Sequence, residues 1–160
     1  MSISPYQYQL LTQSFSTLQP NFHCFCISLK TQLNRYEMQL LLPQNNEQLL
    51  CVEHRVSQFI QEALYLLPQQ EQLTGFVRLH ACQLSSLNPN ERDISVLCNA
   101  MISTLQLHLG AQFTLALRNA WRKALHIFAN IIKSVLFGSN NVVSLAHFKT
   151  HKQQRTSTLR

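Results

Sequence analysis

Apolar residues recur every three or four positions along most of the chain, which is the spacing of one helix face. The clearest stripe of this kind follows Gly110 and consists of Leu117, Trp121, Ala124, Phe128, Ile131 and Val135. Gly110 is suited to end the preceding helix, and Thr114 is suited to cap the next one. No segment keeps the two-residue alternation of a half-buried strand. The pattern therefore predicts an all-α chain.

Prolines and turn residues divide this pattern into six or seven helices. Ser4-Pro5 predicts the first helix start, and Pro20 opens a second helix. A short helix is expected over residues 36–42, where Pro43 would end it, and residues 44–48 read as a polar loop.

The second half of the chain continues in the same way. A long helix is predicted over residues 49–67 and a shorter one over 72–84, with a turn at 85–90. Asn88-Pro89 predicts the start of a further helix, whose apolar face is Ile94, Leu97, Met101, Leu105 and Leu109.

Composition indicates a single domain. The chain has 160 residues, of which 46% are hydrophobic and only 12% are charged. We expect that domain over residues 1–137, followed by a basic, flexible tail over 138–160 with a possible extra turn at 142–148. We expect no membrane span, because no apolar run approaches the roughly 20 residues it needs. The N-terminus lacks a signal-peptide pattern, so the expected location is cytoplasmic.

The net charge of +6 raises the question of an anionic partner. Much of the excess lies in the expected tail, at Lys149, Lys152, Arg155 and Arg160. Aromatic residues do not alternate with these cations, so nucleic-acid binding is not the expected role. A solvated terminus is the simpler interpretation, and a tether to nucleic acid or anionic lipid is the alternative.

Candidate catalytic chemistry is sparse. The cysteines Cys24, Cys26, Cys51, Cys82 and Cys98 fit no zinc-binding spacing, and we interpret them mainly as small core residues. There are seven acidic residues, none paired at a spacing typical of acid–base catalysis, and no glycine-rich phosphate loop. We therefore expect neither an enzyme nor a metal site.

Three segments resemble one family. LHLGAQFTLALRNAWRKALHIFANIIKSVL at residues 107–136 resembles the last two helices of a bacterial-type globin. LTQSFSTLQP at 11–20 resembles the opening of cyanobacterial and flavohaemoglobin-type single-domain globins, and LTGF at 73–76 resembles a segment before their proximal helix. The resemblance covers about residues 8–136 and implies a globin-like fold of six to seven helices.

The register of this resemblance argues against haem. It places Leu84 at the proximal histidine position, Leu42 at the corner phenylalanine, Val52 at the distal polar position and Leu29 at the distal tyrosine. Four aliphatic residues there imply a pocket filled by side chains or by a fatty-acid-like apolar ligand, with no cofactor. The candidate pocket residues are Leu29, Leu42, Val52, Val56, His80, Leu84, Leu97 and Met101.

An alternative keeps the haem. His80 lies one helical turn before Leu84 on the same face, so it could be the iron ligand of an oxygen- or nitric-oxide-binding globin. His54 would then lie near the pocket mouth. The preferred interpretation of His80 is a pocket-facing residue with a backbone or water partner.

The resemblance implies a function of binding rather than catalysis. The chain is similar to the haemless globin domains of bacterial stress and sporulation signalling, so we expect a non-haem sensor or protein-interaction module. A protein partner or a second copy, forming a dimer, could dock on the last two helices through Phe113, Leu117, Trp121, Phe128 and Ile132. These residues could equally belong to the core, which is the preferred interpretation because the domain needs that face.

Overall fold

The computed structural model describes residues 2–39 and 42–138. Within these ranges it contains helices and no strands: α1 (Pro5–Leu18), α2 (Phe22–Leu33), α3 (Asn46–Leu66), α4 (Gln70–Ser86), α5 (Glu91–Leu109) and α6 (Leu115–Phe137), with 3-10 turns at Gln19–Asn21 and Gly110–Gln112. The all-α prediction is confirmed. Apart from Gly138, the expected tail, with its extra turn at 142–148, lies outside the described residues.

Side-chain caps explain where the helices begin. Ser4 accepts a hydrogen bond from the backbone N–H of Gln7, whose side chain bonds back to the Ser4 backbone. Thr114 caps α6 by accepting from the N–H of Leu117. Gly110 ends α5 with a φ of 53°, a conformation that favours glycine. The helix boundaries predicted at Ser4-Pro5, Gly110 and Thr114 are confirmed.

The short helix expected over residues 36–42 is wrong in its described part. Residues 34–39 form turns and bends, and Leu40 and Leu41 lie outside the described residues. The Tyr36 N–H bonds back to the Leu33 carbonyl, and the Gln39 N–H reaches the Asp93 carboxylate at the start of α5. These bonds to turn and distant side-chain acceptors replace a helical ladder.

The starts of α3 and α5 differ from the predicted ones, because in each case an asparagine caps the helix at another position. Asn45 accepts from the Gln48 N–H, so α3 starts at Asn46 inside the expected polar loop. Asn90 forms a capping box with Asp93, so α5 starts after Asn88-Pro89 rather than at it.

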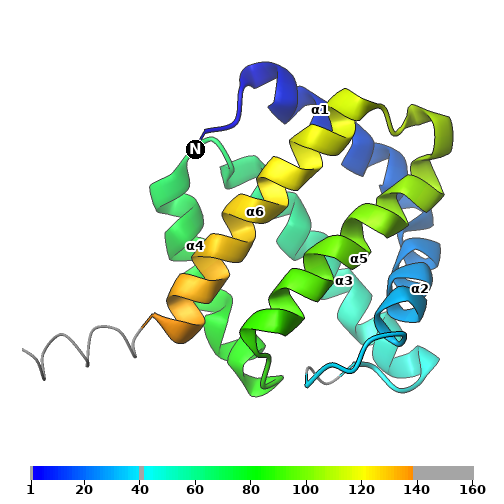
Figure 1. Ribbon diagram of the computed structural model, residues 1–160, viewed down its shortest axis with the longest axis vertical. Coiled ribbons are helices and arrows are strands. Elements are labelled where there is room, and N and C mark those ends of the chain that lie inside the picture. The colour runs from blue at the N-terminus through cyan, green and yellow to red at the C-terminus, as the bar shows by residue number, and fades with distance from the viewer. Residues whose placement is uncertain (1, 40–41, 139–160) are drawn as a thin grey trace, which may run out of the picture.

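The helices pack into two layers. Figure 1 shows α5 and α6 side by side across the face towards the viewer, with α3 behind them. Helix α2 packs on α3 and α5, α4 packs on α3 and α6, and α1 packs on α6 and α3. The buried core between these layers includes Leu11, Phe15, Phe25, Leu67, Leu73, Val77, Leu105, Ala120, Trp121 and Ala124.

Helix α5 has an apolar composition that needs its own explanation. By length and composition alone, the segment Glu91–Gln112 could cross a membrane, and it is the one such segment among the described residues. A central core helix passes the same test. Helix α5 packs against both α2 and α6, and Ala100, Met101, Leu105 and Leu109 are buried in the core. Its apolar face thus has partners within the protein.

Candidate functional site

Three aromatic rings meet between α3 and α4 and are called the ring cluster here: Phe59, Phe76 and His80. Phe59 comes from α3, and Phe76 and His80 lie four residues apart on one face of α4. Phe59 stacks on Phe76 with ring centroids 5.1 Å apart, and its centroid lies 5.6 Å from that of the His80 imidazole. The Phe76 and His80 centroids are 4.5 Å apart. The three rings thus contact one another between α3 and α4, and each residue is partly exposed.

A backbone bond sets the orientation of the His80 ring. Nδ1 of His80 lies 2.9 Å from the carbonyl oxygen of Phe76, one turn earlier in α4. Because a carbonyl only accepts, Nδ1 carries the proton, and the lone pair of a neutral imidazole is then on Nε2. His80 therefore has a backbone partner within its own helix.

The ring cluster decides whether a haem fits here. The Nδ1 bond of His80 suits an iron ligand, since ligand histidines usually donate their other N–H to a carbonyl or carboxylate. The space does not suit a porphyrin. Phe59 is in van der Waals range of both α4 rings, which leaves no gap for a flat macrocycle between His80 and α3. The residues present therefore do not fit a haem in this arrangement.

The eight candidate pocket residues differ widely in burial. Met101 is buried in the core, and Leu29 and Val56 pack against the core from its edge. Leu42, Leu84 and Leu97 are partly buried, whereas Val52 is 42% exposed. His80 belongs to the ring cluster. His54, expected at a pocket mouth, is exposed.

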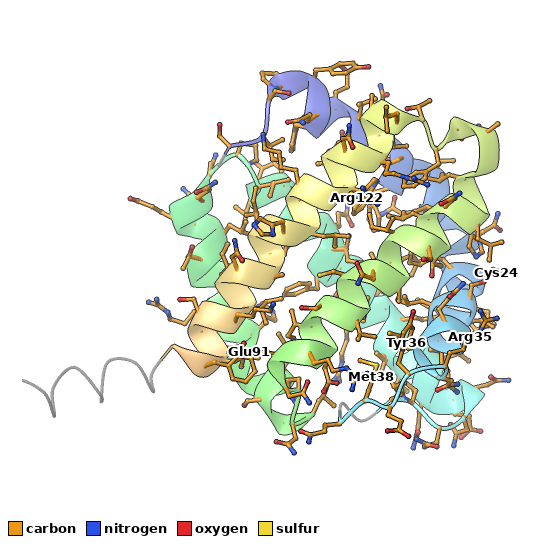
Figure 2. All side chains as sticks on the ribbon, viewed as in Figure 1. Cys24, Arg35, Tyr36, Met38, Glu91 and Arg122 are labelled. Carbon is orange, nitrogen blue, oxygen red and sulfur yellow. The ribbon has the colours of Figure 1, made fainter. Side chains whose placement is uncertain are left out.

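A second feature lies on the other side of the molecule, between α5 and α6. This α5–α6 groove has a volume of about 540 Å³. Helix α5 contributes Ser95, Cys98, Asn99, Ile102 and Ser103, and helix α6 contributes Arg122, Leu125, His126, Ala129, Asn130 and Lys133. The two sets follow helical spacing, so the groove runs along both helices. Figure 2 shows Arg122 on α6.

The groove combines cationic groups with an apolar floor. Arg122 and Lys133 carry positive charge, and no Asp or Glu is among the lining residues. Nζ of Lys133 donates to Oγ of Ser95 at 3.1 Å, and the amide of Asn130 contacts Nε2 of His126 at 3.2 Å. Lys133 thus bonds to a neutral hydroxyl, and the lining offers no carboxylate to either cation. The arrangement can accept an anion.

The predicted docking residues of the last two helices face inward. Leu117 and Trp121 are buried in the core, and Phe113, Phe128 and Ile132 pack against it from its edge. None of the five lines the α5–α6 groove. The sequence prediction named this helix pair but none of the residues that line its outer groove. The signal it could have used is the helical spacing of Arg122, His126 and Lys133 in a helix without acidic residues.

The described cysteines fall into two classes. Cys24 and Cys51 are exposed. Burial raises the pKa of the Cys26 thiol to about 12, and the charge of Glu53 adds to this increase. Burial also raises the pKa of the Cys98 thiol, with Lys133 opposing it. Among the described residues, no three His, Cys, Asp or Glu side chains could hold a metal ion together.

These environments predict two rates of thiol modification. In a Cys82→Ser variant at pH 8, we expect an aromatic disulfide reagent to modify Cys24 and Cys51 rapidly and Cys26 slowly. A thiol of pKa about 12 has roughly a thousandfold less thiolate at pH 8 than one of pKa 9.0. Absorbance of the released thiolate measures the rates, and protein unfolded in urea is the control. Equal rates for all four thiols in the folded protein would contradict the assigned burial.

Comparison with known proteins adds no assignment, because no family model and no curated protein matches this sequence.

Proposed function

We propose that this protein is a globin-like, non-haem interaction module of the sensor type. The observation that carries the proposal is the ring cluster. Phe59 and Phe76 occupy the space beside His80, the histidine on α4 that the sequence offered as an iron ligand. A domain that places its own side chains in this space has no room there for a cofactor, which favours a role in binding other proteins.

Helix pairing supports a globin-like fold. The first helix packs on the last, the second packs on α3 and α5, and α4 packs on α3 and α6. This pairwise packing is of the kind by which globin helices surround their pocket. It agrees with the resemblance of residues 107–136 to the final globin helices.

A cytoplasmic role is consistent with the cysteines. Cys24, Cys26, Cys51 and Cys98 are free thiols, and exposed free thiols such as Cys24 are typical of a reducing compartment. For the interaction itself, the α5–α6 groove is the surface that best suits a protein partner, since it joins an apolar floor to charged and polar side chains.

A haem globin is the second candidate, because one observation favours it. The bond from Nδ1 of His80 to the Phe76 carbonyl leaves Nε2 with its lone pair, as an axial ligand requires. This candidate needs Phe59 to move away from His80 when haem enters.

The absorption spectrum of freshly purified protein distinguishes the two. The proposal predicts no Soret band. A Soret band that disappears in a His80→Ala variant would establish the haem globin instead, and a band that persists in this variant would assign the iron to another ligand. Either band would overturn the proposal.

A further inference from the structure

We propose that the α5–α6 groove binds an acidic amphipathic helix of a protein partner. The inference rests on the proposed interaction function and names the chemistry of the partner. It starts from the lining of the groove, which joins two cations, several neutral polar groups and an apolar floor without any carboxylate.

The spacing of the cations selects an elongated partner. Arg122 and Lys133 are eleven residues apart on α6, which corresponds to about 16 Å along the helix and nearly the same face. A single phosphate or carboxylate can reach only one of them. A helix with acidic residues about three turns apart can reach both, so the groove favours a peptide segment over a small anion.

The floor of the groove suits the apolar face of such a helix. Ile102 from α5 and Leu125 and Ala129 from α6 present apolar surface between the two cations. Apolar residues of an amphipathic helix recur at three- and four-residue spacing, and grooves of this kind bind them. The partner would thus bury its apolar residues centrally and direct its acidic residues to the groove's ends.

Charge argues against a second copy as the occupant. Helix α6 carries Arg118, Arg122, Lys123 and Lys133 and no acidic residue. Helix α5 has no charged residue after Asp93 apart from the titratable His108. Two copies facing each other through this groove would oppose cations to cations, which disfavours association. An acidic partner removes this repulsion.

A carboxylate of a bound partner would be a stronger hydrogen-bond acceptor for Lys133 than its present acceptor is. Its Nζ donates to the neutral Ser95 hydroxyl at 3.1 Å. A carboxylate in the groove would give it a charge-assisted bond, which is roughly twice as strong as a neutral one. Binding therefore gains at the Lys133 end of the groove.

The test measures binding of one designed peptide by fluorescence anisotropy. The peptide is a labelled amphipathic helix with leucines on one face and glutamates eleven residues apart. We expect saturable binding that an Arg122→Gln/Lys133→Gln double variant weakens about tenfold or more. The matched control is Arg78→Gln/Lys123→Gln, which removes the same charge outside the groove lining and should bind like the wild type. Circular dichroism verifies that both variants are folded.

Several results would overturn the inference. The peptide could fail to bind, or the control variant could lose as much affinity as the groove variant. A single-stranded oligonucleotide of equal charge could bind through Arg122 and Lys133 in preference to the peptide. A wild-type dimer that the Arg122/Lys133 variant abolishes would make a second copy the occupant. None of these results depends on haem binding, so this inference and the non-haem proposal fail separately.

Discussion

Replacing Trp121 with alanine is expected to lower the free energy of unfolding by about 3–5 kcal/mol, enough to unfold a marginally stable domain. The indole is 1% exposed and lies in the main core. Its Nε1 donates to Oγ of Ser14 at 2.9 Å, and that hydroxyl donates to the Leu11 carbonyl at 2.9 Å. Trp121 thus joins α6 to α1 by packing and by a buried hydrogen bond.

Urea unfolding followed by circular dichroism measures this loss, because Trp121 is the only tryptophan and its removal eliminates the fluorescence signal. A Trp121→Phe variant keeps much of the ring but leaves Oγ of Ser14 without its donor, so we expect a smaller loss of about 1–2 kcal/mol. Ser14→Ala should show coupling with Trp121→Phe in a double-mutant cycle. A loss of unfolding free energy below about 1 kcal/mol for Trp121→Ala would contradict the burial of this residue in the core.

Replacing Phe59 with alanine has the second-largest expected effect. We expect the free energy of unfolding to fall by about 2 kcal/mol, because Phe59 packs against both rings of α4 while staying partly exposed. The deletion should leave a partly open hollow next to Phe76 and His80. Apolar hollows of this size can take up small aromatic molecules. Benzene is therefore expected to stabilise the variant but not the wild type.

Urea unfolding with and without benzene tests for this hollow. Phe59→Leu is the control, since it fills most of the space and should lose less stability and respond less to benzene. If benzene changed the free energy of unfolding of Phe59→Ala and of the wild type equally, the Phe59 side chain would not occupy a space that benzene can enter.

Local signals predicted most of the helices. Ser4-Pro5, Gly110 and Thr114 act through bonds and dihedral angles within a few residues, so the sequence alone identifies them. In the mispredicted segment 36–39, the Gln39 N–H bonds to the Asp93 carboxylate, more than fifty residues later in the chain. No local pattern contains that partner.

The candidate site could be predicted from the sequence only in part. The helices predicted over 49–67 and 72–84 contain Phe59 and Phe76, but the stacking of these rings depends on how closely α3 approaches α4. The groove has the same limitation: the spacing of Arg122 and Lys133 is visible in α6, whereas the α5 residues opposite them follow from packing. The family register alone singled out Leu84 and could not show that rings fill the space beside His80.

Hemin titration of the purified wild-type chain tests the central claim most directly. Because Phe59 fills the space beside His80, we predict only the broad absorbance of unbound hemin at every ratio. A sharp, saturable Soret band at one hemin per chain, lost in His80→Ala, would show that the ring cluster opens for an iron-bound porphyrin and would contradict the account.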